Sequence, residues 1–79
     1  MKKSEFLLEL DEIVEEEPGT IKETDILKDV NGWDSMAVLG FIAMLDEKFG
    51  LIVEPEKIAD AIVVSDLITF LDGNITLTD

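Results

Sequence analysis

The chain has 79 residues, of which 47% are hydrophobic, and its 19 acidic and 6 basic side chains give a formal net charge of −13 at pH 7. This length suffices for one compact core but not for a deep enclosed cleft, so it disfavours an ordinary single-domain enzyme. The charge disfavours binding to nucleic acid or anionic membranes and predicts partners with basic patches. Cysteine and histidine are absent, which excludes disulfide bonds, a thiolate nucleophile and the usual zinc ligands.

The first predicted element is an amphipathic helix that starts at a serine cap, Ser4. Its apolar side chains recur at spacings of three and four residues: Phe6, Leu7, Leu10, Ile13 and Val14. Pro18 disfavours helical geometry at the residue before it, so we expect this helix to end near Glu16.

The same N-terminal stretch begins with two lysines, as a signal peptide does, but acidic residues interrupt any apolar run there. No apolar run elsewhere in the sequence is long enough to span a bilayer. We therefore expect a cytoplasmic protein without stable membrane insertion.

A long connection then runs to Asp34, and we expect one helical turn within it, around Asp25–Lys28. The following helix, Asp34–Phe49, has the strongest local signals, because it begins at an aspartate cap and ends before Gly50. One face of this helix is apolar and is predicted to point into the core: Val38, Phe41, Ile42, Leu45 and Phe49.

Two further helices complete the expected fold. Pro55 suits the first position of a short helix that extends to about Asp60. A last helix should cover residues 64–71, stop before Gly73 and leave residues 74–79 frayed. The sequence therefore predicts a single all-α domain over residues 1–79, a small four-helix bundle with three longer helices and one short helix.

Residues 32–36 form the segment with the clearest chemical content, Gly-Trp-Asp-Ser-Met. This segment could have a purely structural role, with a glycine in a turn, a buried tryptophan and a capped helix start. However, Ser35 stands at the tip of a long loop and at the start of the most regular helix, where a hydroxyl is exposed. Ser35 has no evident activating partner, so we expect no catalytic residue. The preceding residues lack the ligand pattern of an EF-hand, and no metal site is expected.

These features together resemble the acyl carrier proteins, and the resemblance covers nearly the whole chain. It rests on the order of the helices, on Asp34-Ser35-Met36 at the start of the second, on Pro55 at the start of the third and on residues 64–67, Val-Ser-Asp-Leu, at the start of the fourth. In that family a phosphopantetheinyl transferase attaches 4′-phosphopantetheine from coenzyme A to the serine of an Asp-Ser-Leu/Met motif, which maps onto Ser35. Asp34 then serves as part of the motif and as the helix cap.

The resemblance implies a monomeric, non-enzymatic carrier of acyl thioesters in fatty-acid, polyketide or related specialised biosynthesis. Its partners would be the transferase and acyl-activating, acyltransferase or synthase enzymes with basic or apolar docking patches. The reactive thiol would belong to the attached arm, so a chain without cysteine could still carry thioesters. A phosphodiester on Ser35 would meet free N–H groups and the positive end of the helix dipole.

The side of the second helix opposite its core face is the expected docking surface for these partners. Five candidate partner-binding residues lie on it, with Ala37 and Met44 flanking: Met36, Gly40, Ala43, Asp46 and Glu47. Many family members carry acids where this chain has Ala37 and Gly40, so an apolar docking stripe beside Ser35 is one interpretation. The other interpretation is that these small residues simply tolerate exposure and have no docking role.

A bound acyl chain could also fold back between the second helix and the last two, as the family resemblance implies. Seven apolar positions are candidates to line such a pocket: Ile42, Leu45, Phe49, Val53, Ile58, Ala61 and Leu67. Ordinary core packing would explain every one of them equally well.

Two alternatives stay open at this point. The first is a D-alanyl or other aminoacyl carrier, since that class shares an Asp-Ser-Met motif; a peptidyl carrier is less favoured, because it usually has glycine where this chain has Asp34. The second is a non-enzymatic acidic adaptor that binds a basic partner through charge alone. The adaptor would tolerate replacement of Ser35, and a carrier would not.

Overall fold

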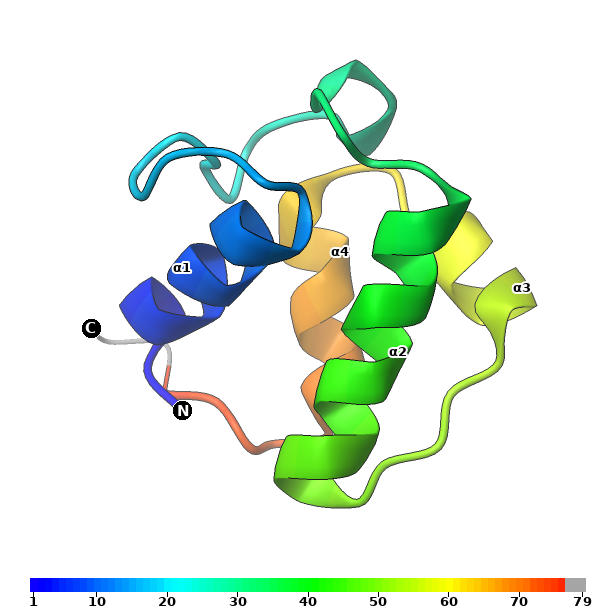
Figure 1. Cartoon of the computed structure of the whole chain (residues 1–79). Coiled ribbons are helices and arrows are strands. Elements are labelled where there is room, and N and C mark those ends of the chain that lie inside the picture. The colour runs from blue at the N-terminus through cyan, green and yellow to red at the C-terminus, as the bar shows by residue number, and fades with distance from the viewer. Residues whose placement is uncertain (77–79) are drawn as a thin grey trace.

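In the computed structural model of the chain, which describes residues 1–76, four α-helices pack around one core (Figure 1). The helices and two short 3₁₀ turns are, in chain order, α1 (Lys3–Ile13), η1 (Leu27–Asp29), α2 (Ser35–Phe49), α3 (Pro55–Ala59), α4 (Val64–Ile68) and η2 (Thr69–Leu71). Among the described residues no strand forms, and only two isolated β-bridges are present, Lys2 with Thr76 and Ile26 with Val63. The all-α prediction is confirmed over this part of the chain.

The prediction of three longer helices and one short helix was wrong in its proportions. The last helix was expected over residues 64–71, but it is α-helical only as α4, and its final turn tightens into the 3₁₀ turn η2. Short 3₁₀ turns are common at helix ends. The bundle therefore has two long helices, α1 and α2, and two short ones, α3 and α4.

Helix α1 begins and ends earlier than the sequence predicted. Ser4 is not its cap, because the helix starts at Lys3 and the Glu5 carboxylate accepts a hydrogen bond from the Lys2 N–H over 2.9 Å. The helix ends at Ile13, three residues before the predicted Glu16. The cause is a left-handed residue, Glu15, with φ of 61°, which turns the chain out of the helix.

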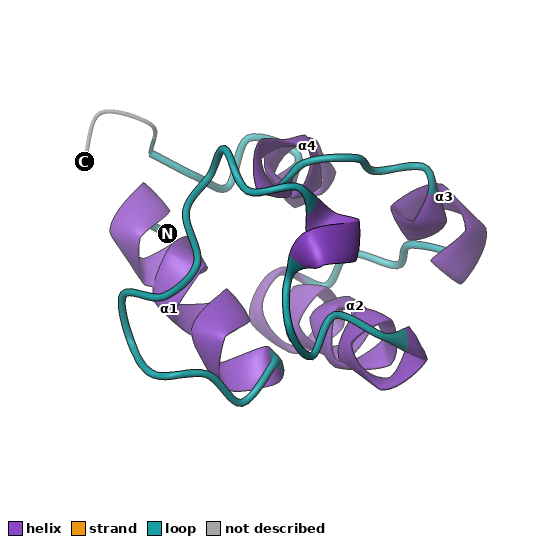
Figure 2. Cartoon of the chain, turned by 90° about the horizontal axis from the view of Figure 1, so that it is seen from above, coloured by secondary structure: helices purple, strands orange, loops and turns teal. Residues whose placement is uncertain are grey.

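The connection from α1 to α2 passes across one end of the bundle, as the view from above shows (Figure 2). A buried carboxylate ties it to α1: Asp11 accepts hydrogen bonds from the N–H groups of Gly19 and Ile21, over 2.8 and 2.9 Å. The predicted helical turn is present two residues later, as η1, where Leu27 is buried and donates its N–H to the Ile62 carbonyl. The loop is thus fastened at two places along its length.

The core brings together apolar side chains from every helix and from the long loop. The fully or nearly fully buried members are Phe6, Leu10, Val14, Ile21, Leu27, Ala37, Phe41, Met44, Leu45, Ile58, Val64, Leu67 and Leu71. At its centre Phe6 of α1 meets Phe41 of α2 edge to face, with ring centroids 6.2 Å apart.

The core face of α2 is wider than its sequence predicted. Phe41 and Leu45 are buried as expected, whereas the other three predicted core residues, Val38, Ile42 and Phe49, are half-buried. Ala37 and Met44, expected at the edge of the exposed side, are buried instead. The reason is that α2 lies between α1 and α3 and contacts both, so two of its flanks are covered (Figure 2).

The prediction that residues 74–79 are frayed is wrong for residues 74–76. The Thr76 N–H donates to the Met1 carbonyl over 2.7 Å, and the Lys3 N–H donates to the Thr76 carbonyl over 3.0 Å. The rest of the predicted fraying, at residues 77–79, lies outside the described part. Within residues 1–76, none of the helices has the length and apolar character needed to cross a membrane.

Candidate functional site

Ser35 is the first residue of α2, and its side chain is exposed. Asp34 precedes it as the N-cap, with extended backbone angles, and its Oδ1 accepts a hydrogen bond from the Ala37 N–H over 3.0 Å. The predicted cap is therefore confirmed. The Ser35 hydroxyl makes no hydrogen bond to any other described residue, so it is available to an incoming group.

The first turn of α2 leaves hydrogen-bond donors at this position. The Val38 N–H donates to the Asp34 carbonyl and the Ala37 N–H to the Asp34 carboxylate. The N–H groups of Ser35 and Met36 have no partner among residues 1–76, as is usual at a helix start. An anionic group attached to Ser35 would meet these donors and the positive end of the helix dipole.

No base among the described residues is hydrogen-bonded to the Ser35 hydroxyl. The chain has no histidine or cysteine, and neither of the two ion pairs among the described residues, Lys3 with Glu23 and Lys48 with Glu9, involves Asp34.

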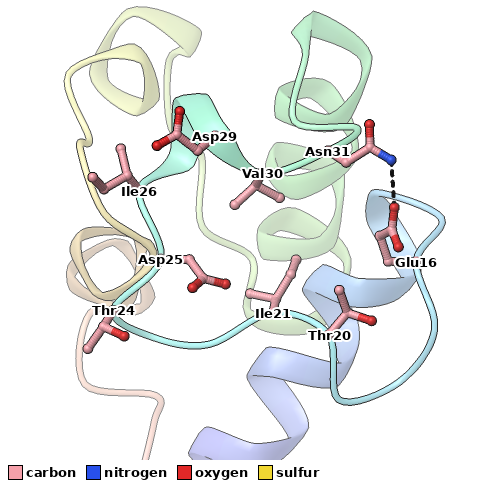
Figure 3. A pocket seen from close by; sticks show the side chains of 9 residues that line it. All are labelled: Glu16, Thr20, Ile21, Thr24, Asp25, Ile26, Asp29, Val30 and Asn31. Atoms are coloured by element: carbon pink, nitrogen blue, oxygen red, sulfur yellow. Dashed lines mark hydrogen bonds between the residues drawn. The ribbon is translucent and has the colours of Figure 1, made fainter.

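The residues just before Ser35 are held against the end of α1. Asn31 donates from Nδ2 to Oε1 of Glu16 over 2.8 Å, the bond drawn in Figure 3. Gly32 follows with φ of 88°, and a Cβ placed there would lie 2.5 Å from the Val14 carbonyl oxygen. Only glycine fits this contact, which fixes where the chain enters α2.

Four of the five candidate docking residues are exposed, and one is not. Met36 is 73% exposed, and Ala43, Asp46 and Glu47 are exposed as well. Gly40 was expected on this side but is half-buried, because it faces α1: a Cβ there would lie 3.4 Å from Cγ2 of Ile13.

Leu39, which the sequence analysis missed, is 54% exposed and joins this surface. Its spacing of three residues from Met36 and four from Ala43 was the available signal. Met36, Leu39 and Ala43 together form the apolar part of the α2 surface, and Asp46 and Glu47 form its acidic end.

The seven candidate acyl-pocket residues belong to the packed interior. Leu45, Ile58 and Leu67 are completely buried. The remaining four are partly buried and pack against the core: Ile42, Phe49, Val53 and Ala61. None of them lines the three surface hollows described below, so an acyl pocket at these residues stays a prediction.

Three hollows mark the surface near α1 and the long loop, and the sequence indicated none of them. The largest, about 580 Å³, lies inside the curve of the loop (Figure 3) and is lined by Glu16, Thr20, Ile21, Thr24, Asp25, Ile26, Asp29, Val30 and Asn31. A second, about 330 Å³, lies between the end of α1 and the start of α2, beside Ser35. A third, about 390 Å³, lies against α1 and Pro18.

The acidic residues around these hollows do not form a metal site. In the described residues no group of three or more carboxylates is placed closely enough to hold a metal ion. Asp25 instead caps its own turn, because its Oδ2 accepts the Lys22 N–H over 2.9 Å.

No family model, curated protein or solved structure matches this chain. The functional interpretation therefore rests on the residues themselves, above all on Ser35, its Asp34 cap and the surface around them.

Proposed function

We propose that this chain is an acyl carrier protein in which Ser35 carries 4′-phosphopantetheine. The observation that supports the proposal most is the position of Ser35: an exposed, unbonded hydroxyl on the first residue of α2, directly after a capping aspartate. The surrounding sequence, Gly-Trp-Asp-Ser-Met, and the order of the four helices support it further.

The attachment step uses little from the carrier itself. The Ser35 Oγ attacks the phosphorus next to pantetheine in coenzyme A, and the P–O bond of the diphosphate breaks. Adenosine 3′,5′-bisphosphate leaves, and the serine proton passes to a base on the transferase, since no base among the described residues is hydrogen-bonded to the Ser35 hydroxyl. The carrier presents the hydroxyl at a fixed place, because Gly32 and Asp34 hold the entry into α2.

Once attached, the arm supplies the thiol on which acyl groups travel as thioesters between enzymes. In this proposal the carrier itself catalyses no reaction, which agrees with its small size and acidic surface. The pathway could be fatty-acid, polyketide or related specialised biosynthesis. A D-alanyl or other aminoacyl cargo is the variant of the proposal that the Asp-Ser-Met motif also permits.

The test is intact-mass measurement after incubation with coenzyme A and a phosphopantetheinyl transferase. The wild type should gain the mass of one phosphopantetheine, and Ser35→Ala should gain nothing. Ser4→Ala is the matched control, because Ser4 is also an exposed serine in the first turn of a helix; it should load like the wild type. An unmodified wild type with several transferases, or a modified Ser35→Ala, would overturn the proposal and favour an acidic adaptor.

The same assay separates the two parts of the α2 surface. If the apolar part dominates docking, Met36→Asp should lower kcat/KM for loading by about tenfold, since an apolar side chain loses its contact area. If charge dominates, Glu47→Lys should have the larger effect and should lose it at high salt. Loading that is unchanged in both variants would refute this surface as the docking site.

A further inference from the structure

The hollow beside Ser35 joins two helix ends that are far apart in the sequence. It has a volume of about 330 Å³ and is lined by Ile13, Val14, Glu15, Gly32, Asp34, Met36 and Ala37. Both neighbours of Ser35 are among these residues, so whatever approaches the serine also approaches this hollow. We call it the α1–α2 hollow.

The floor of the α1–α2 hollow is apolar. Val14 and Ala37 are buried members of the core, and Ile13 is half-buried. Gly32 adds no side chain, because a Cβ there would collide with the Val14 carbonyl oxygen. The hollow therefore offers an apolar bed of the kind that the methylene stem of a long side chain covers.

The rim of the hollow is negative and has no compensating cation. Glu15 and Asp34 are both exposed. Glu15 makes no side-chain hydrogen bond to any described residue, and Asp34 uses one carboxylate oxygen, Oδ1, for the Ala37 N–H. Neither takes part in the two ion pairs found in residues 1–76. Two carboxylates thus face solvent above an apolar floor.

Glu15 also occupies a backbone position that does not suit it. Its φ of 61° follows the C-terminal end of α1, where glycine is the usual residue. Helix α2 obeys this rule, because it ends at Gly50 with φ of 67°. Backbone geometry therefore does not account for a glutamate at position 15.

We propose that the α1–α2 hollow receives a long basic side chain, arginine or lysine, of the phosphopantetheinyl transferase, and that Glu15 thereby strengthens binding of the carrier to that transferase. This inference rests on the proposed function of Ser35. The stem of the basic side chain lies on the apolar floor, and its charged end meets the carboxylates of Glu15 and Asp34. The contact adjoins the α2 surface defined by Met36, Leu39 and Ala43, because Met36 belongs to both.

The test uses two substitutions of Glu15 in the full chain, with a transferase that loads the wild type. Glu15→Gln removes the charge and keeps the shape, and Glu15→Gly also relieves the left-handed backbone. Both should raise the KM for the carrier roughly threefold to fivefold, as expected for one exposed charge pair, with kcat unchanged. The rise should shrink at high salt, and the melting temperature of Glu15→Gly should not fall below that of the wild type.

Asp72→Gly is the matched control. Asp72 is the other non-glycine residue of the described chain with positive φ, at 51°, and it is exposed. It caps η2, at the opposite end of the bundle from the start of α2 (Figure 1). Asp72→Gly removes the same charge and relieves the same kind of backbone conformation, and it should leave the KM unchanged.

The outcomes separate this inference from the proposed function. A wild type that accepts no phosphopantetheine refutes the proposed function, and the inference with it. A wild type that is loaded, with an unchanged KM in Glu15→Gln and Glu15→Gly, refutes the inference alone. An equal rise in Asp72→Gly also refutes it, because the effect would then follow net charge and not the hollow.

Discussion

Replacing Asp11 by asparagine should destabilise this domain more than any other loss of a single negative charge. Asp11 is 1% exposed, the only polar side chain buried in the described chain. Its two oxygens accept separate N–H groups of the long loop, Oδ2 that of Gly19 and Oδ1 that of Ile21. Asparagine keeps the shape but turns one acceptor into an NH₂ group, so one backbone N–H would face another donor.

The size of the effect follows from these two bonds. A hydrogen bond to a charged group contributes about 1.5 to 3 kcal/mol, and one between neutral groups about 1 kcal/mol. Asp11→Asn loses one charged bond and weakens the other, so the expected loss is about 2 to 3 kcal/mol. A domain of this length has a total stability of about 4 to 12 kcal/mol. The melting temperature should therefore fall by roughly 10 °C or more.

The measurement is urea unfolding followed by circular dichroism, with amide hydrogen exchange at Gly19 and Ile21. Exchange at Ile21 should accelerate most. Its N–H is buried and bonds to Asp11, so loss of that bond removes its main protection from exchange. Asp60→Asn is the control, since Asp60 is exposed and its carboxylate bonds to no described residue. If Asp11→Asn is within about 0.5 kcal/mol of Asp60→Asn, the loop is not held by this carboxylate.

Two further predictions concern the loop before Ser35 and the start of α4. Gly32→Ala should be about 2 kcal/mol more destabilising than Gly19→Ala, because both glycines have φ near 90° but only Gly32 faces a backbone atom, Val14 O, at 2.5 Å; equal losses in urea unfolding would contradict the close contact. Asp66 has a pKa below its ordinary value of 3.8. The main cause is the hydrogen bond that its carboxylate accepts from the Val63 N–H, and the bond from the Ile62 N–H lowers the pKa further; together they outweigh burial, which raises it. A lowered folded-state pKa means that this stabilisation is present above the ordinary value and is lost as pH falls through the lowered one. Asp66→Asn should therefore cost stability at neutral pH and little in strong acid, and a cost that is the same at both pH values would count against this cause.

The structure of α2 was predictable because its signals are local. An aspartate before the helix and a glycine after it define both boundaries, and both residues take the expected roles. The boundaries of α1 were less predictable, since its N-cap is Lys2, whose N–H bonds to Glu5, and a glutamate takes the left-handed position where glycine is the usual signal. Capping rules therefore locate a helix end only where the residue type that they expect occupies the position.

The orientation of α2 was only partly predictable from its periodicity. Spacing identifies one apolar face but does not show how many neighbours cover a helix. Ala37, Gly40 and Met44 are covered because α1 packs on that flank as well. Leu39 could have been found from its spacing alone, whereas the burial of Asp11 could not, because its partners follow in a separate segment.

Trp33 gives the protein a built-in optical reporter. It is the only tryptophan in the chain, it precedes Ser35 by two residues, and its ring meets that of Phe41 edge to face with centroids 6.4 Å apart. The side chain is half-buried, so its emission depends on how the loop sits on the bundle. Fluorescence can therefore follow events at Ser35 in real time, without a label on either the carrier or its partner.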